Sequence, residues 1–390
     1  LLLAATEYKT NIFFPLFEKR IPELLTNTTD NWIGISLNYL SQALPAFALA
    51  GYLKERHPGF KLIIGGGLVT SWLRSPSWIN PFTGLFDHLI AGRGEPHLLK
   101  LLGNKHSTQE YPPDFSALPL QGYLSPGLVL PYSASTGCYW NRCSFCPEKA
   151  EGNAYRKRSD AQVVEELSQL CDRHHPRLIH FLDNAVAPSL MRQLIDTPLG
   201  VDWYSFARVS SELGNQEFCK RLRQSGCVML KLGIESGSQQ VLDAMDKGID
   251  LALVERALAA LKSAGIATYV YLLFGTPAED IDEARKTLAF TASNADAIGF
   301  LNLAVFNLPR NSAEAQSLTV HDFSSGDLHL YSDFHHPRGW ERKNVRHFLS
   351  TEFKSHPAIR PILQRDPPFF TSNHAPFVLH AKQQIKETLP

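Results

Sequence analysis

The stretch TGCYWNRCSFCPE, residues 136–148, places three cysteines within nine positions, at Cys138, Cys143 and Cys146. It follows LPYSAST (130–136), a short apolar segment that is typical of a buried strand, so the cysteines fall on the loop after a strand. Six cysteines in 390 residues are too few for a disulfide scaffold. The spacing therefore indicates metal ligation in a reducing compartment.

Four interpretations of these cysteines compete. A chance group of core cysteines is disfavoured, because three thiols stand together on one loop. A structural zinc ion needs four ligands, and no fourth Cys or His stands at a finger-like spacing, since the next His is His174. A plant-type [2Fe–2S] cluster would take Cys171 as its distant ligand, although Cys171 lies in an amphipathic helical pattern that suits a core residue. A [4Fe–4S] cluster on three thiolates would leave one iron open to a cosubstrate.

Apolar segments and helical patterns alternate around this loop. Amphipathic helical patterns separate the segments, so the sequence predicts a parallel sheet of six βα units, an α/β fold that forms a partial barrel over residues 131–315. The predicted strands are 130–136, 177–184, 201–209, 228–236, 267–275 and 297–306.

The N-terminal part has the same alternation on a smaller scale. A helix is predicted over 41–56, and the order of elements indicates a Rossmann-like domain over residues 1–105, followed by a Pro- and Gly-rich linker at 106–130. The chain does not begin with Met, so we treat this domain as open to being incomplete at its N-terminus. The strands predicted here are WIGISL (32–37), KLIIGGG (61–67) and FDHLIAG (86–92).

Charge and hydropathy limit the partners. Lys plus Arg and Asp plus Glu both number 38, so the balance gives no basic field for nucleic acid or for an anionic membrane surface. The longest apolar run, near 43–53, is too short to span a bilayer, and the N-terminus lacks the features of a signal peptide. A cytoplasmic protein is expected.

The cysteine loop and the segments after it resemble the radical S-adenosylmethionine (SAM) superfamily. The superfamily's usual spacing is C-x3-C-x2-C, and this chain has one residue more between Cys138 and Cys143. The resemblance implies that the three cysteines hold a [4Fe–4S] cluster whose open iron binds SAM, and that Phe145 lies beside the adenine. An electron from the cluster would then cleave SAM to a 5′-deoxyadenosyl radical.

Further segments match the superfamily in the correct order along the chain. IHFLDNAVAP, KLGIESGSQQVLDAMDKG and YLLFGTPAEDIDEARKT resemble its second, fourth and fifth strand regions. Glu235 could otherwise be a helix N-terminal carboxylate and Arg208 an ordinary salt-bridge partner, while Thr276 is expected to cap the next helix. The cofactor-binding residues implied by the resemblance are Phe145, Asp183, Asn184, Arg208, Glu235, Ser236 and Gly275.

The front domain resembles the cobalamin-binding domain that precedes many radical SAM barrels. FDHLIAG does not have the Asp-x-His-x-x-Gly spacing of a lower-axial His, so no His ligand to cobalt is expected. A domain that has lost its corrinoid is the alternative. The resemblance implies that Ser36, Leu37, Tyr39 and Gln42 line the cofactor, that Gly65, Gly66, Gly67 and Thr70 admit its tail, and that Gly92, Gly94 and Glu95 close the site.

Together these resemblances imply a cobalamin-dependent radical SAM enzyme that methylates an unactivated carbon by way of the 5′-deoxyadenosyl radical and methylcobalamin. A cyclase or rearrangement enzyme with the same cofactors is the main alternative, and a [2Fe–2S] electron carrier is the non-catalytic one. A methylthiotransferase is disfavoured because no Cys precedes Cys138. The expected partners are a small-molecule or peptide substrate and a donor such as flavodoxin or ferredoxin.

The last residues, 316–390, form a predicted C-terminal extension that is rich in aromatic and His side chains. These side chains either cover the barrel mouth or only pack the extension onto the barrel. Packing is favoured for most of them. The side chains concerned are Tyr331, Phe334, His335, His336, Trp340, Phe369, Phe370 and His374.

Overall fold

The fold is described from a computed structural model. It describes residues 1–26, 31–75, 78–103, 112–123, 125–310, 312–321, 328, 330–365 and 375–377. The chain divides into two compact units, one of Leu1–Glu110, Pro309–Asn311 and Val320–Asp333, the other of Tyr111–Leu308, Ser312–Thr319 and Phe334–Pro390. The predicted extension began at 316, whereas the structure groups Val320–Asp333 with the first unit.

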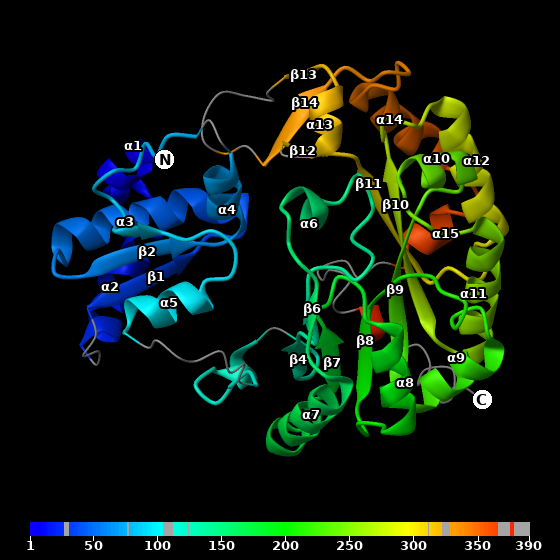
Figure 1. Ribbon diagram of the computed structural model, residues 1–390, viewed down its shortest axis with the longest axis horizontal. Helices are drawn as coiled ribbons and strands as arrows, with labels where there is room; N and C mark the ends of the chain where they lie inside the picture. Colours follow the sequence, from blue (N-terminus) through cyan, green and yellow to red (C-terminus); the bar gives the residue numbers. More distant parts are fainter. Residues whose placement is uncertain are drawn as a thin grey trace. The chain divides into compact units, whose positions relative to one another are not determined.

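The first unit has a three-stranded parallel sheet in the order β1-β2-β3, as the Rossmann-like pattern predicted. Figure 1 shows β1 and β2 beside α3. Its core is an aromatic group in which Phe47 of α3 meets Phe82 edge-on at 4.7 Å between ring centroids. Helix α1 packs so closely on α3 at Gly51 that an added Cβ there would lie 1.9 Å from the Ala5 carbonyl oxygen. The elements are α1 (Leu2–Thr6), α2 (Phe14–Leu25), β1 (Trp32–Ser36), α3 (Ala43–Arg56), β2 (Lys61–Gly65), α4 (Gly67–Arg74), β3 (His88–Leu89) and α5 (Glu95–Leu101).

The predicted linker carries little regular structure where it is described. Residues 112–123 and 125–128 contain one short 3-10 turn, Leu120–Gly122, and the first strand of the second unit begins at Val129. Residues 106–111 and 124 lie outside the described residues.

The second unit is built on a six-stranded sheet in the order β11-β10-β9-β8-β7-β4, and all neighbouring strands are parallel. The order follows the chain, and the end strands β4 and β11 do not pair with each other, so the sheet is the predicted partial barrel. The strands are β4 (Val129–Tyr132), β7 (Leu178–Phe181), β8 (Asp202–Ala207), β9 (Cys227–Glu235), β10 (Ala267–Phe274) and β11 (Phe300–Val305).

Helices line the outer face of this sheet (Figure 1). Outward side chains such as Trp203, Leu230 and Val270 form the main core with them, while inward side chains such as Tyr204 and Tyr269 form a smaller inner cluster. The alternation follows the two-residue period of strands. The helices are α7 (Asp160–His174), α8 (Pro188–Asp196), α9 (Gln216–Gln224), α10 (Gln239–Ala244), α11 (Leu251–Ala264) and α12 (Ile281–Ser293).

Four helices of the barrel begin at residues whose side chains cap them. Ser159, Asn215, Ser238 and Asp250 each accept a hydrogen bond from a backbone N–H in the first turn of α7, α9, α10 and α11. Thr276 was expected to cap α12, and this prediction is wrong, because Asp280 accepts from the N–H groups of Asp282 and Glu283 instead.

The C-terminal segment contributes short elements. Three strands form a small sheet in the order β12-β14-β13. The elements are β12 (Leu308–Pro309), α13 (Ala313–Ser317), β13 (Val320–His321), β14 (Tyr331–Phe334), α14 (Arg342–Phe348), a π-helical turn (Leu349–Phe353) and α15 (Arg360–Leu363).

Most of the described aromatic side chains of this segment are packed. Phe334 lies in a cluster with Phe306 and Leu308, and Trp340 joins the main core of the second unit. His335 is exposed, while Phe369, Phe370 and His374 lie outside the described residues. The packing of Phe334 and Trp340 agrees with the alternative that these side chains pack against the barrel.

Candidate functional site

The cysteine loop lies at the carboxyl edge of the partial barrel, between β5 (Ser135–Thr136) and α6 (Pro147–Ala150). Its three thiols are free, with Cys143 buried and Cys138 and Cys146 partly exposed. Burial raises the pKa of Cys146, whereas the N–H groups of Glu148 and Lys149 at the start of α6 lower it. These N–H groups favour a thiolate, which is the form that binds metal.

The three cysteines stand on one loop. Across the described ranges, no three His, Cys, Asp or Glu side chains converge on one metal ion. In an iron–sulfur cubane each thiolate binds its own iron, so three cysteines of one loop can serve as its ligands. Cys171 lies buried on α7 within the main core, which removes the fourth ligand from the [2Fe–2S] interpretation.

Asp183 and Asn184, after β7, hold the backbone that leads into the cysteine loop. The Asp183 carboxylate accepts from the Ala134 N–H at 3.0 Å and from the Ser135 hydroxyl, and Asn184 Nδ2 donates to the Gly137 carbonyl at 3.2 Å. Burial raises the pKa of Asp183, and these donors oppose the rise. Both residues were predicted to bind cofactor, and in the structure their side chains position the loop.

Glu235, at the end of β9, has the left-handed backbone conformation, with φ of 71°. Its carboxylate folds back over Gly233, where a Cβ would lie 2.4 Å from Oε1, and it pairs with Lys247 Nζ at 2.8 Å. The same ammonium lies 5.4 Å from the centroid of the Phe145 ring. The structure therefore brings two predicted residues, Glu235 and Phe145, together around a lysine.

Ser236 was predicted to lie near SAM, and its hydroxyl is fully buried in the turn behind Glu235. It accepts from the Ser238 N–H at 3.1 Å and lies 3.0 Å from the Thr287 hydroxyl of α12. Its described contacts are therefore those of a residue that shapes the turn.

Arg208 extends from β8 to the cysteine loop. One guanidinium nitrogen lies 4.0 Å from Cys143 Sγ and the other donates to the Lys247 carbonyl at 2.6 Å. The guanidinium also stacks over the Trp140 ring, 4.3 Å from its centroid. Burial raises the pKa of the Cys143 thiol, and the charges of Lys247 and Arg208 oppose that rise.

Gly275 ends β10 with a left-handed φ of 81°, which favours glycine. Its N–H donates to the buried Glu279 carboxylate, which also accepts from Trp340 Nε1 at 2.9 Å. Burial raises the pKa of Glu279 to about 7. His336 lies 2.9 Å from the Thr276 carbonyl through Nε2, so two side chains of the C-terminal segment hold this loop.

In the first unit, the predicted cobalamin residues gather at the carboxyl ends of β1 and β2. Gly66, with φ of 102°, is required by the fold itself, because a Cβ there would lie 2.4 Å from the Leu37 carbonyl oxygen. Leu37 is fully buried in the core, so its side chain does not line an open surface. Thr70 donates to the Gly66 carbonyl at 2.8 Å and accepts from the Gly92 N–H at 2.9 Å, which ties the loops after β2 and β3 together.

The other predicted residues of this edge remain accessible. Ser36, Tyr39, Gln42, Gly92 and Glu95 are exposed, and Gly65, Gly67 and Gly94 are half-buried. Gln42 accepts from the backbone N–H groups of Asn38 and Tyr39, both at 3.0 Å, and so shapes the loop after β1. Asp87 of FDHLIAG accepts from the Leu62 N–H at 2.7 Å and pairs with Lys54 at 2.8 Å, which gives it a structural role.

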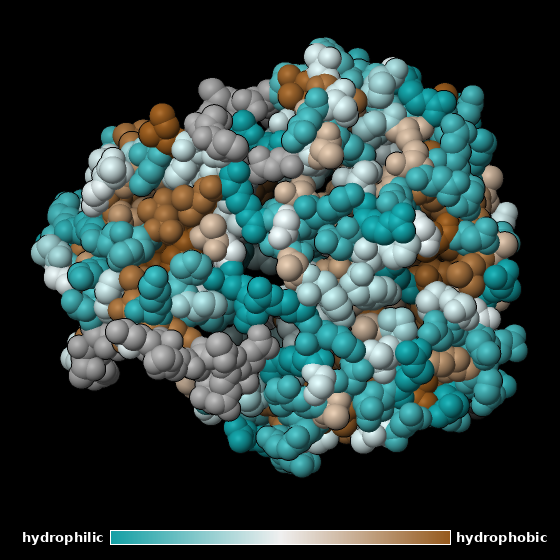
Figure 2. Space-filling view, in the orientation of Figure 1, coloured by the Kyte–Doolittle hydropathy of each residue, from teal (hydrophilic) through white to brown (hydrophobic). Residues whose placement is uncertain are grey.

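Large apolar side chains are exposed in the same region. They belong to the segments that follow β1 and β2, and Figure 2 shows apolar surface on the first unit. A contiguous apolar surface can mark a binding face for a flat organic ring or for another protein. The side chains are Tyr39, Leu40, Leu44 and Leu73.

The sequence did not single out Lys247 and Trp140, although both stand inside stretches that it marked as important. Trp140 Nε1 donates to the carbonyl of Asp246, the neighbour of Lys247, at 3.0 Å, and a separation of more than 100 residues hides this contact from sequence patterns. Gly248 follows Lys247, and a Cβ added there would lie 2.0 Å from the Trp140 ring.

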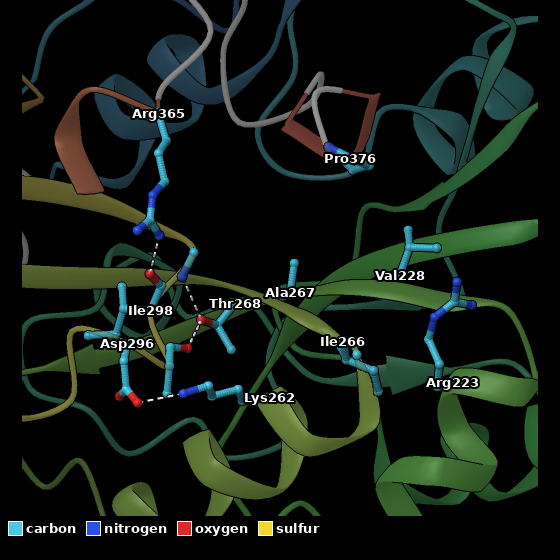
Figure 3. A pocket seen from close by; sticks show the side chains of 13 residues that line it. Arg223, Val228, Lys262, Ile266, Ala267, Thr268, Asp296, Ile298, Arg365 and Pro376 are labelled. Atoms are coloured by element: carbon cyan, nitrogen blue, oxygen red, sulfur yellow. Dashed lines mark hydrogen bonds and ion pairs between the residues drawn. The ribbon is translucent and has the colours of Figure 1, made fainter. Parts of the chain in front are cut away.

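A cavity of about 240 Å³ lies at the opposite, amino end of β9, β10 and β11, and it contains none of the predicted site residues (Figure 3). Several of its polar groups bond to groups within its own lining. Arg365 donates to the Ile298 carbonyl at 3.2 Å, Lys262 pairs with Asp296, and Thr268 donates to the Ala297 carbonyl at 2.8 Å. We assign this end to stability, as is usual for the amino face of barrels.

With this geometry in view, residues 132–291 match the model of the Radical SAM superfamily, so this part of the chain is a radical SAM domain. Domains of this class bind a [4Fe–4S] cluster and SAM, which confirms the class that the cysteine motif predicted. Within the described residues, no helix combines the length and apolar character needed to cross a membrane.

Known proteins share the same fold or parts of the sequence. An uncharacterized methyltransferase of Pyrococcus horikoshii is 28% identical over 188 residues, which are 46% of this chain and 40% of that protein. The anaerobic magnesium-protoporphyrin IX monomethyl ester cyclase of Rubrivivax gelatinosus is 27% identical over 187 residues, 45% of this chain and 33% of the cyclase. The chain thus spans less than half the length of these two curated relatives.

A solved structure extends the likeness to the first unit. The radical SAM methyltransferase TsrM from Kitasatospora setae, with its tryptophan substrate and a SAM analogue, superposes with a TM-score of 0.60. The superposition covers 83% of this chain and 75% of TsrM at 18% identity, so it shows a shared fold.

Proposed function

We propose that this protein is a cobalamin-dependent radical SAM enzyme that methylates an unactivated carbon. The observation that carries the proposal is the cysteine loop at the carboxyl edge of the half-barrel, with Glu235, Arg208 and Phe145 gathered beside it. The Rossmann-like first unit and its exposed apolar edge support a corrinoid as the second cofactor. A structure of TsrM contains both cobalamin and a [4Fe–4S] cluster.

Cys138, Cys143 and Cys146 would hold the cluster, and the side chains around them would bind SAM. When bound, the cluster and corrinoid supply an electron for SAM cleavage and a transferable methyl group, chemistry that side chains cannot provide. Glu235 offers a carboxylate to the ammonium or ribose of SAM, and Phe145 offers a ring to its adenine. Arg208 is already bonded to the Lys247 carbonyl and stacked on Trp140, so its larger role would be to hold the loop.

In the first unit, backbone close to Gly65, Gly66 and Gly67 would admit the corrinoid tail. Thr70 and Gly92 would keep the neighbouring loops in register through their hydrogen bond. The substrate would be a small molecule or peptide. The electron would come from flavodoxin or ferredoxin in the cytoplasm, where thiols stay reduced.

Anaerobic reconstitution tests the proposal directly. We expect about four iron atoms and one cobalt atom per chain, and both 5′-deoxyadenosine and S-adenosylhomocysteine when SAM and dithionite are added. Iron-loaded protein that never releases 5′-deoxyadenosine, with or without candidate substrates, would refute the radical SAM assignment. Protein that releases it but binds no cobalamin would refute the corrinoid part alone.

A cyclase is the second candidate, because one curated relative with a similar barrel segment is a cyclase. The two candidates differ in the fate of the methyl group of SAM. With methyl-labelled SAM, a methyltransferase places the label in product, whereas a cyclase forms product without it.

A further inference from the structure

The turn Met245–Gly248, which follows α10, is bound to the cysteine loop along its whole length. Three polar contacts and one close packing contact join the two segments, and they involve protein groups alone. The contacts are Ser144 N–H to the Met245 carbonyl at 3.0 Å, Trp140 Nε1 to the Asp246 carbonyl at 3.0 Å, Arg142 Nε to the Asp246 carboxylate at 3.0 Å, and Gly248 against the Trp140 ring.

This turn presents Lys247 to the interior of the site. Lys247 is 6% exposed, and its ammonium pairs with the half-buried Glu235 at 2.8 Å. Its carbonyl accepts from Arg208 at 2.6 Å, so the backbone and side chain of Lys247 are both fixed. A buried ion pair adds little net stability, because desolvation offsets the attraction, so stability alone does not account for a lysine here.

The charge of Lys247 lies beside the cysteine loop. Its ammonium is 5.4 Å from the centroid of the Phe145 ring, and Phe145 stands between Cys143 and Cys146 in the sequence. A positive charge beside a cluster favours the state with one more electron, because that state is more negative. Groups beyond the ligands tune the potential of metal sites in this way.

We propose that Lys247 is a positioning residue of the radical SAM site, which holds Glu235 in its left-handed conformation and supplies positive charge that raises the reduction potential of the cluster. The inference rests on the proposed function, because it assumes that the three cysteines hold a [4Fe–4S] cluster. Under this proposal, the Met245–Gly248 turn fixes the position of the cysteine loop and that of the Lys247 charge.

Lys247→Gln tests the proposal, because glutamine keeps a donor for Glu235 and loses the charge. In the reconstituted full chain, we expect the ratio of reduced to oxidised cluster at a fixed potential to fall roughly tenfold. The measurement is a dithionite redox titration followed by electron paramagnetic resonance, without substrate. Lys247→Arg should restore the wild-type ratio, and Lys262→Met, which removes an exposed paired lysine from the far end of the barrel, should leave it unchanged.

An unchanged ratio in an iron-loaded Lys247→Gln protein overturns the proposal. If that variant holds no iron, Lys247→Met/Glu235→Gln is measured instead, because it leaves no uncompensated buried charge. SAM binding by calorimetry that is weaker in this double variant than in Glu235→Gln alone supports the positioning role of Lys247, whereas equal affinity in the two variants, or a second failure to hold iron, overturns it. Wild-type protein that cleaves no SAM would instead refute the proposed function.

Discussion

At the scale of single residues, the three thiols of the loop and the thiol of Cys171 differ in their surroundings. Cys143 lies beside Arg208, whereas Cys171 packs among the apolar side chains of the main core. We expect Cys143→Ala to lose iron, because the cluster would keep only two of its thiolate ligands. The matched change Cys171→Ala should keep the wild-type iron content and lower the free energy of unfolding by about 1 kcal/mol. Iron analysis and denaturant unfolding check both expectations, and iron loss in the Cys171 variant would revive the [2Fe–2S] interpretation.

Glu279 gives a second prediction at this scale. Its carboxyl group is fully buried and its pKa is raised from 4.5 to about 7. The folded state therefore keeps its proton over a range where the unfolded state has lost it. The free energy of unfolding should fall by about 3 kcal/mol as pH rises from about 4.5 to about 7, and stay level above that.

Glu279→Gln should remove this part of the pH dependence, because the amide still accepts from Gly275 and Trp340 but does not titrate. Urea unfolding at pH 5 and pH 7.5 measures it. Glu255→Gln, an exposed change on α11, should keep the wild-type slope. A Glu279→Gln variant that keeps the wild-type slope would show that the pKa of this carboxyl is not raised in the folded state.

At the scale of elements, the turn Met245–Gly248 gives a steric prediction. Gly248 has φ of 65° and faces Trp140, whereas Gly265 has a similar φ of 73° and no atom within 4 Å of an added Cβ. Gly265→Ala should cost about 1–2 kcal/mol of unfolding free energy, from backbone conformation alone. Gly248→Ala should cost about 2–5 kcal/mol, because the clash with the ring adds to the same term. Equal losses in the two variants would mean that Trp140 moves aside freely.

The elements themselves were largely readable from the sequence. The six barrel strands have buried, alternating or continuous apolar patterns, and three of the helices, α7, α9 and α11, begin at a Ser, Asn or Asp residue, which is a local signal. The cap of α12 was predicted wrongly, because Asp280, four residues after Thr276, accepts from the first-turn N–H groups. The identity of the cap depended on the path of the Gly275 loop, which the C-terminal segment holds.

Side-chain direction was the part of the site that sequence could not supply. Asp183 and Ser236 stand in the expected segments, yet their polar atoms bond to backbone and to Thr287. Lys247 lies twelve residues after its partner Glu235, across a helix, so no periodicity connects the two. Such pairs arise from tertiary packing, which neither motif spacing nor propensity encodes.

At the scale of the whole molecule, the two units have separate cores, and each would bind a different cofactor under the proposed function. A ligand stabilises the unit that binds it, so the two cofactors should act on different parts of the unfolding transition. We expect hydroxocobalamin to protect the backbone amides of β1, β2 and α3 from hydrogen exchange. SAM, added to the cluster-loaded protein, should protect those of β9 and of the Met245–Gly248 turn. Hydrogen–deuterium exchange measured by mass spectrometry under anaerobic conditions separates the two effects. Protection of β9 by hydroxocobalamin alone, without change in β1 and β2, would contradict the assignment of the corrinoid to the first unit and leave the radical SAM assignment of the second unit intact.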